Sequence, residues 1–521
     1  MDFIQSQNRA QVSFGSLEDL VEADNAVRLI DAFTEQLELP RLGFKVKVLK
    51  SEGRPAYESV LFLRLYFYGY LNGLRSGRTL ERECTRNTEL QWLLGGLKPN
   101  YHTITDFRAQ NPKALRNTFK LFVLFLKDAE LVSGNVIAID GTKFRAHNSK
   151  KNNYNPKKLE RHLTYIDEKV NEYLNALDEM DRSEKPERVK DIKEKIKRLK
   201  NNKIKYEALG DLIEMRNEPQ ISTTDPDSRA LLVQGQVVEV SYNAQAAVDS
   251  KHKLVVATHT INRNDRNALS DIAKEAKSNL QVNDMTIIAD KGYHNARELQ
   301  DCKDNNITTI VAHAELVNSN AKGTTPAYMV DKFIYNKEDD TYTCPAGQTL
   351  KTIGTWHTKT RSERAVGYQY KKYRTPACKQ CPVRDLCTAK ADGRREIERS
   401  EFAEASQENL LRYKANGTLY RTRQEINEHI FGTIKRKWGY NHTNLIGLEK
   451  VNGEMALIFT VYNFKRVMNI LKFDKFLERL KNWKPDYEKI VRTFFKTDFI
   501  SSKMSTSFFQ LRILIMNFRV Q

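Results

Sequence analysis

VIAID, at residues 136–140, is a short apolar run that ends in an aspartate and is followed by Gly141. Its length and its β-branched residues are typical of a buried strand. MTIIAD, at residues 285–290, repeats the pattern, so Asp290 ends the second run as Asp140 ends the first. Ligand sites in open α/β sheets gather at the carboxyl ends of strands, which makes both aspartates candidates for one site. The alternative is that each aspartate only caps the turn after its strand.

The segments around these two runs predict a mixed α/β fold. Residues 239–250 and 253–262 favour a hairpin of two strands, residues 265–279 a helix, and residues 307–313 a further strand. With a helix around residue 428, this order is the one expected of a ribonuclease H-like catalytic core, in which helices flank a mixed sheet.

The composition indicates a folded basic protein with a polyanionic partner. The chain has 521 residues, a formal net charge of +19 and 40% hydrophobic residues. Nucleic acid is the favoured partner because Lys and Arg neutralise phosphates, although a merely basic soluble protein would have the same balance. The longest apolar runs, such as LFVLFL at residues 121–126, are too short to span a bilayer, and the N-terminus lacks the apolar core of a signal peptide. We therefore expect a cytosolic protein.

YRTRQEINEHIFGTIKRKWGY, at residues 420–440, predicts an amphipathic helix. Its apolar line consists of Ile426, Ile430 and Ile434. Arg421, Glu428 and Lys435 lie seven residues apart, so on a helix the side chains of successive members point in directions that differ by only about 20°. By itself such a polar line is also typical of a solvated helix face.

Asp140, Asp290 and Glu428 have the chemistry of a two-metal site. Magnesium prefers carboxylate oxygens and leaves positions open for phosphate. Two such ions held by three carboxylates can activate an attacking hydroxyl or water and stabilise the leaving oxygen of an in-line phosphoryl displacement. Further acidic residues, interpreted as supporting or turn residues, are Asp225, Asp227 and Asp265.

On these residues the chain resembles bacterial DDE transposases encoded by insertion sequences, in the large group with a Tyr-Arg-Glu-Lys signature. AIDGTKFRAHNSK at residues 138–150 is similar to the segment around the family's first aspartate, and ADKGY at 289–293 to that around the second. The signature is matched by Tyr420, Arg423, Glu428 and Lys435. The resemblance spans most of residues 10–470.

One spacing departs from this signature. Four residues separate Arg423 from Glu428, where the signature has three. On an ideal helix Arg423 lies about 140° from Glu428, whereas Arg421 lies about 20° away, so Arg421 is an alternative for the phosphate contact. Glu425 is a rival carboxylate, but its spacing to Lys435 does not fit.

The resemblance implies strand cleavage and strand transfer at the terminal inverted repeats of an insertion sequence, in the bacterial cytosol or nucleoid. It assigns Mg²⁺ or Mn²⁺ to the three carboxylates. The DNA contacts that it implies are Tyr420, Arg421 or Arg423, and Lys435. The partners would be terminal-repeat and target DNA, and synapsis of two ends favours a homodimer. The alternatives are a ribonuclease H-like nuclease that cuts without joining and an inactive DNA-binding protein.

Four of the six cysteines are close in sequence: Cys344, Cys378, Cys381 and Cys387. A C-x-x-C pair with two outlying cysteines can close a tetrahedral thiolate site for structural zinc, with His357 as a replacement ligand. A reducing cytosol favours metal over disulfides in such a cluster. The alternative is four reduced thiols.

The predicted organisation has seven segments. They are a helical DNA-binding domain (1–130), the first strand of the core (131–149), a helical-hairpin insertion (150–235), the continued core (236–320), a cysteine-rich insertion (321–405), the C-terminal helices of the core (406–475) and a tail (476–521). For the first segment, a helical dimerisation domain is the alternative to a DNA-binding module.

Overall fold

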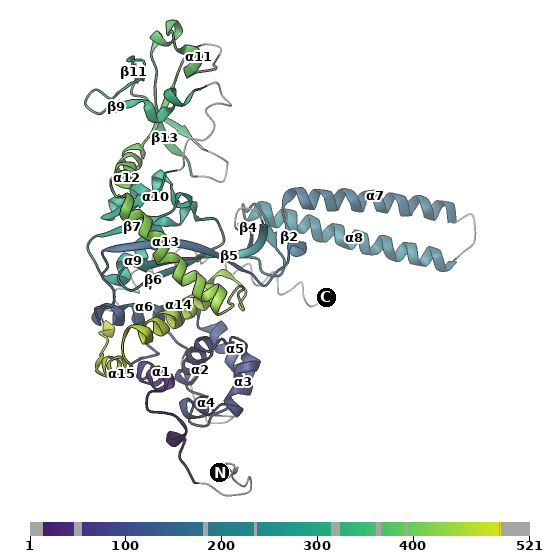
Figure 1. The fold of residues 1–521 in the computed structure, drawn as a ribbon. Coiled ribbons are helices and arrows are strands. Elements are labelled where there is room, and N and C mark those ends of the chain that lie inside the picture. Colours follow the sequence, from purple (N-terminus) through teal and green to yellow (C-terminus); the bar gives the residue numbers. More distant parts are fainter. Residues whose placement is uncertain are drawn as a thin grey trace, which may run out of the picture.

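The computed structural model describes residues 14–45, 55–180, 186–233, 237–313, 324–360, 366–390, 393–488 and 490. Figure 1 shows a central sheet with helices around it, a long two-helix arm, and an end unit of small sheets. Among the described residues, no helix has the length and apolar character needed to cross a membrane. Most of the predicted C-terminal tail lies outside these residues.

A mixed six-stranded sheet forms the centre of the molecule. Its order is β4-β5-β1-β7-β8, and β6 also pairs with β5. The strands are β1 (Val136–Arg145), β4 (Arg229–Val233), β5 (Val237–Asp249), β6 (Leu254–Ile261), β7 (Met285–Ala289) and β8 (Ile307–Val311). β1 runs antiparallel to β5 and parallel to β7, which is parallel to β8. The mixed α/β fold predicted from the apolar runs is therefore present.

Helices cover this sheet. They are α6 (Pro112–Asp128), α9 (Leu269–Leu280), α10 (Ala296–Asp304), α12 (Ala403–Ala415), α13 (Gly417–Phe431) and α14 (Leu448–Ile470). α14 packs on α6 and β6, whereas α13 crosses β1 and β7. Because helices cover the sheet, β7 and the first half of β1 are apolar runs, and Ile137, Ala138 and Ile139 are completely buried.

Buried asparagines satisfy the backbone of β6 and β8, two of the outer strands. Asn463 of α14 accepts from the N–H of Val255 at 2.8 Å and donates to its carbonyl at 2.7 Å. Asn409 of α12 does the same for Val311 of β8, at 2.9 and 2.8 Å. Each amide takes the place of a neighbouring strand at that residue, so α14 and α12 protect sheet edges that would otherwise expose unpaired groups.

The N-terminal helices share a hydrophobic core with the sheet. They are the short 3₁₀ helix η1 (Leu17–Leu20), α1 (Ala26–Glu35), α2 (Ser59–Leu71), α3 (Gly77–Arg86), α4 (Thr88–Leu93) and α5 (Tyr101–Gln110). α15 (Phe473–Asn482) packs against α1. The ring of Phe33 on α1 contacts those of Phe67, Phe122 and Phe464, which come from α2, α6 and α14. One continuous cluster thus joins both parts.

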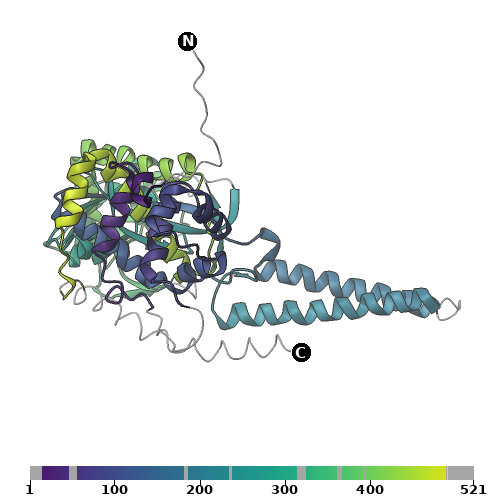
Figure 2. The same cartoon turned by 90° about the horizontal axis from the view of Figure 1, so that it is seen from below.

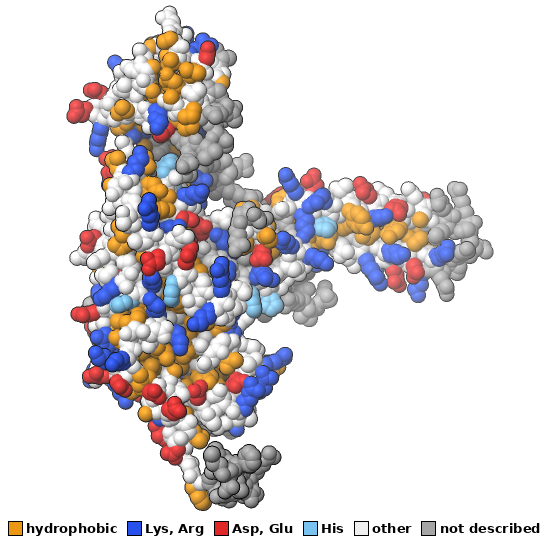
Figure 3. All heavy atoms as spheres, viewed as in Figure 1, with side chains coloured by type: hydrophobic (Ala, Val, Ile, Leu, Met, Phe, Trp, Pro, Cys, Tyr) orange, Lys and Arg blue, Asp and Glu red, His pale blue; other side chains and the backbone are white. Residues whose placement is uncertain are grey.

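The arm consists of α7 (Pro156–Met180) and α8 (Pro186–Met215), which lie side by side and extend away from the rest of the molecule in Figures 1 and 2. At its base β2 (Asn153–Tyr154) pairs with β3 (Ile221–Ser222). A separate small core at the base contains Tyr154, Leu159, Ile213 and Ile221. Figure 3 shows apolar side chains along the arm between Lys and Arg side chains.

The end unit holds two three-stranded sheets. The first has β9 (Ile334–Asn336), β10 (Thr341–Thr343) and β11 (Thr349–Lys351), and the second β12 (His357–Lys359), β13 (Tyr368–Tyr373) and β14 (Ile397–Ser400). Short helical segments complete it: η6 (Pro326–Tyr328), η7 (Val330–Lys332), η8 (Pro376–Gln380) and α11 (Arg384–Cys387). Its buried core is small: Phe333, Tyr342, Leu350, Tyr373 and Ile397.

Candidate active site

Asp140 and Asp290 lie beside each other where β7 ends. The predicted strand end at Asp140 is wrong, because β1 stays paired with β5 as far as Arg145 and Asp140 lies within the strand. Ile139 of β1 is the parallel partner of Ala289 of β7, so the next residue on each strand is an aspartate. Asp140 Oδ1 accepts the N–H of the following residue at 2.8 Å, and Asp290 Oδ1 accepts the N–H two residues later at 2.8 Å. Asp290 therefore caps the turn after β7, whereas Asp140 lies within β1 opposite Ala246 of β5, and the two carboxylates also interact electrostatically.

Asp140 shares its surroundings with two further carboxylates, those of Asp290 and Asp265. Burial is the main reason why the pKa of Asp140 is raised to about 6, and the carboxylates of Asp290 and Asp265 add to that effect. The N–H of Gly141 and the guanidinium of Arg423 act in the opposite direction. Crowded carboxylates of this kind can bind a hard divalent cation through their oxygens.

Arg423 is the residue of α13 that reaches the aspartates. Its Nη1 lies 3.8 Å from Asp140 Oδ2, and its Nε is buried without a hydrogen-bond partner among the described residues. The guanidinium carbon lies 5.8 Å from the ring centre of Tyr420, while Arg421 is exposed. Arg423 faces the sheet because it precedes the buried Ile426 by three residues, which is nearly one helical turn.

Glu428 lies on the exposed side of α13 and accepts a hydrogen bond from Gln424 at 2.7 Å. The preceding residue, Asn427, is buried, and neither polar atom of its side chain has a partner in the described part of the chain. Over the same residues, no three Asp, Glu, His or Cys side chains form a group that could hold a metal ion. The structure thus brings Asp140 and Asp290 together, but not Glu428 with them.

Lys435 lies in a π-helical turn, Gly432–Lys437, that follows the end of α13. The continuous helix predicted over residues 420–440 is therefore wrong at this point, because the α-helical hydrogen-bond pattern ends before the lysine and the wider turn changes its direction. Lys435 Nζ donates to the carbonyl of Lys143 on β1 at 3.0 Å. Burial lowers the pKa of Lys435.

Asp265 belongs to a polar network behind the two aspartates. Its Oδ1 accepts from Asn243 Nδ2 at 2.8 Å and from Gln245 Nε2 at 2.9 Å, and its Oδ2 lies 3.2 Å from Lys143 Nζ. The buried hydroxyl of Tyr293 donates to Gln245 Oε1. A buried network of this kind holds its side chains in place, because moving one of them would leave the hydrogen-bonding groups of its neighbours without partners.

Gly141 allows this network to approach β1. A Cβ atom at this position would lie 2.2 Å from Gln245 Nε2 and 2.8 Å from Asp265 Oδ1. The sequence contained a signal for the network: Asn243 and Gln245 interrupt an apolar strand two residues apart, and residues with that spacing point to the same face. For their partner Asp265 the sequence alone predicts only a supporting or turn role.

Asp225 and Asp227 lie in the loop before β4 and hydrogen-bond β5 and the start of α14, away from the aspartate pair. Asp225 Oδ1 accepts the hydroxyl of Tyr242 at 2.7 Å, and Asp227 Oδ2 accepts the N–H of Leu448 at the start of α14 at 2.9 Å. Asp227 therefore provides a carboxylate at a helix N-terminus, where negative charge is favourable.

The cysteines Cys344, Cys378, Cys381 and Cys387 line one pocket of the end unit. Burial is the main cause of the raised pKa of Cys387, and the other three thiols raise it further. Cys344 comes from the turn between β10 and β11, where its Sγ accepts the N–H of Gln348 at 3.3 Å. All four thiols are free, and His357 does not line the pocket.

Comparison with known families gives two matches. A model described as a transposase DDE domain matches residues 343–468, which include Glu428 and the four cysteines. A model described as a transposase domain (DUF772) matches residues 15–110, in the N-terminal helices. No curated protein and no solved structure gives a match. The two family matches, one at each end of a chain with a mixed α/β sheet, support a DDE-type transposase that acts on DNA.

Proposed function

We propose that the chain is the transposase of a bacterial insertion sequence, which cleaves DNA at the element's terminal inverted repeats and joins the ends to target DNA. The observation that carries this proposal is the pair Asp140, within β1, and Asp290, directly after β7, on adjacent parallel strands. The order and direction of β6, β5, β1, β7 and β8 support a ribonuclease H-like core. A nuclease that cuts without joining is the alternative. The setting would be the bacterial cytosol, with two copies pairing two DNA ends.

Magnesium or manganese fits the residues at this edge of the sheet. Asp140 and Asp290 offer neighbouring carboxylate oxygens, and a divalent cation would offset the crowding that contributes to the raised pKa of Asp140. Glu428, whose side chain lies on the exposed side of α13, would be the third carboxylate of the set. When bound, the metal would supply positive charge for phosphoryl transfer.

The basic residues of α13 and of the turn after it would position the DNA. Arg423 would exchange Asp140 for a phosphate, because its guanidinium is already at the site and its Nε is free to donate. Lys435, tied to β1 by a single ammonium group, would act as a point charge. Tyr420 offers a half-buried ring and hydroxyl beside Arg423, and the exposed Arg421 would contact DNA on the outer side of the helix.

A strand-transfer assay tests the proposal. Purified protein, magnesium, a labelled terminal repeat of the element and a target plasmid should give labelled ends joined to the plasmid. Asp140→Asn, Asp290→Asn and Glu428→Gln should each abolish joining, whereas Asp284→Asn, an exposed aspartate just before β7, should leave it intact. Cleavage without joining would support the nuclease, and wild-type cleavage by all three variants would refute the active-site assignment.

We also propose a structural zinc in the end unit. The four thiols come from three segments, the β10–β11 turn, η8 with its C-cap, and α11, and they line one pocket without forming a closed metal site as they stand. The unit's buried core is small, so a metal that drew the thiols together would compensate for the limited hydrophobic burial. Zinc content of the purified protein measures this directly. Cys381→Ser should lose zinc, whereas Cys302→Ser, at a buried and isolated cysteine, should retain it. Wild-type protein without zinc, or full zinc in Cys381→Ser, would refute this site.

A further inference from the structure

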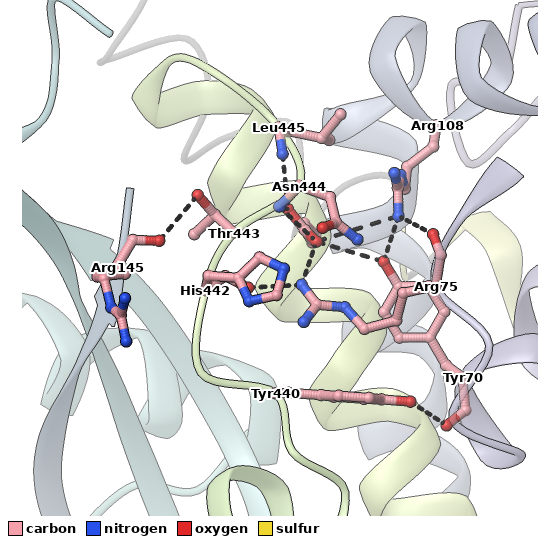
Figure 4. A network of polar contacts seen from close by, with 10 residues as sticks. Tyr70, Arg75, Arg108, Arg145, Tyr440, His442, Thr443, Asn444 and Leu445 are labelled. Atoms are coloured by element: carbon pink, nitrogen blue, oxygen red, sulfur yellow. Dashed lines mark hydrogen bonds and ion pairs between the residues drawn. The ribbon is translucent and has the colours of Figure 1, made fainter. Parts of the chain in front are cut away.

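Two arginines share one buried carboxylate where the N-terminal helices meet α14 (Figure 4). Glu454 of α14 is completely buried, and its Oε1 lies 2.7 Å from Arg75 Nη2 and 4.0 Å from Arg108 Nη1. The backbone N–H groups of Asn444 and Leu445 donate to Oε2 at 3.0 and 3.1 Å. The carboxylate is therefore fully used by the donors around it.

This cluster has an excess of positive charge. In the described part of the chain, Glu454 is the only carboxylate within 4.0 Å of either Arg75 or Arg108. The side chains of the two arginines are only 8% and 4% exposed, and the Nε of each is buried with no partner in the same residues. Buried charge without a counterion is unfavourable, so an anion entering here would be stabilised.

A cavity of about 400 Å³ lies beside the two arginines. It is lined by Gly73, Arg75, Ser76, Arg108, Trp438, Gly439, Tyr440, His442 and Asn444. Its walls come from the loop between α2 and α3, from α5, and from the segment that joins α13 to α14. The volume falls within the range of roughly 300–1,000 Å³ that is usual for small-ligand sites.

The N-terminus of α3 opens on the same cavity. Ser76 is the N-cap residue of α3 and lines the cavity, but its side chain makes no capping hydrogen bond. The first turn of α3 contains no acidic residue that would offset the helix dipole. Unpaired N–H groups at a helix start favour anions, and the N-cap residue of α3 lines the same cavity as the two arginines.

We propose that this cavity binds a phosphate group, and that it holds one backbone phosphate of the DNA on which the transposase acts. Only the DNA part rests on the proposed function. Guanidinium forks together with a helix N-terminus are suited to a tetrahedral oxyanion. His442 lies at the exposed mouth of the cavity, where burial and Arg75 lower its pKa. A bound phosphate would oppose the contribution of Arg75 to that shift.

Binding of inorganic phosphate to the full-length protein tests the site without any need for DNA activity. Ser76→Asp puts a carboxylate at the cavity mouth while keeping a residue that is as good an N-cap as serine. Asn100→Asp is the matched control, because Asn100 is the N-cap of α5 and does not line the cavity. By calorimetry, wild type and Asn100→Asp should bind phosphate, and Ser76→Asp should lose at least roughly tenfold in affinity.

Two results would overturn the phosphate site: wild type that binds phosphate no better than chloride at equal ionic strength, or Ser76→Asp that binds it as Asn100→Asp does. For DNA, the slope of log K against log salt should fall in magnitude by about 0.9 in Ser76→Asp relative to Asn100→Asp, the value for one lost phosphate contact. If the wild type binds phosphate and Ser76→Asp does not, but Ser76→Asp and Asn100→Asp give equal slopes with DNA, the DNA part is overturned and the site is assigned to free phosphate. Failure of strand transfer alone would refute the proposed function and leave the phosphate result standing.

Discussion

Replacing Glu454 with glutamine should selectively destabilise the junction between the N-terminal helices and α14. Glutamine keeps the shape of the side chain but has only one acceptor oxygen. With that oxygen toward Arg75, its NH₂ group faces the N–H groups of Asn444 and Leu445, and in the other orientation it faces the guanidinium. Either orientation places donors against donors and leaves Arg75 and Arg108 without a carboxylate. Removing one partner of a buried ion pair costs about 3–5 kcal/mol.

Hydrogen exchange measures this cost locally, which suits a large chain that need not unfold in one step. At about 1.4 kcal/mol per factor of ten, backbone amides of α14 and of residues 440–447 should exchange roughly 100- to 4,000-fold faster in Glu454→Gln. Glu478→Gln, on the exposed side of α15, is the control and should leave these rates unchanged. Rates in Glu454→Gln equal to those of the control would show that the carboxylate does not hold the junction.

Two further outcomes follow from close contacts and charge. Gly141→Ala should lower the free energy of unfolding by about 1–3 kcal/mol and reduce strand cleavage, because the new Cβ would lie 2.2 Å from Gln245 Nε2. Urea unfolding measures the change in stability. Gly210→Ala is the control that should not be destabilised, because no atom lies within 4 Å of a Cβ built there. Acidification should loosen the end unit, because Lys371 and two tyrosine hydroxyls lower the pKa of Asp340 to about 2, against the effect of burial. The stabilisation is present above the unfolded value of 3.8 and is lost as pH falls through about 2. Tyrosine fluorescence should show a smaller acid transition in Asp340→Asn, and identical profiles would contradict this assignment.

The central strands could be predicted from the sequence because their physical cause is local. β7 and the first half of β1 are short β-branched runs that are buried, so each is visible as an apolar segment before an aspartate, whereas the polar second half of β1, as far as Arg145, was not predicted as strand. The helix over residues 420–440 was only partly correct. Its isoleucine spacing predicted the buried side of α13, but the π-helical turn at Gly432–Lys437 depends on how the chain docks on β1, which periodicity does not encode.

The arrangement around the candidate site was less accessible, because it depends on contacts between distant segments. Helical phase alone favoured Arg421 as the neighbour of Glu428, but the sheet lies against the side of α13 that carries Arg423. Asp265 resembled a turn residue until its partners on β5 were known. The sharing of Glu454 by two arginines joins residues more than 300 positions apart, and no local pattern marks such a pair.

The short β2–β3 pair at the base of the arm makes the arm a replaceable module. Paired strands lie about 4.8 Å apart, so the chain leaves and re-enters the body at nearly the same point. Among the described residues, α7 and α8 pack mainly on each other and the small core lies within residues 154–221, while Glu218 and Gln220 bond Arg229 and Ala230 of β4 at the base. Lengthening, shortening or exchanging α7 and α8 would therefore leave the register of β1 against β5 unchanged. The reach of the arm can vary during evolution without any change in the positions of the two aspartates.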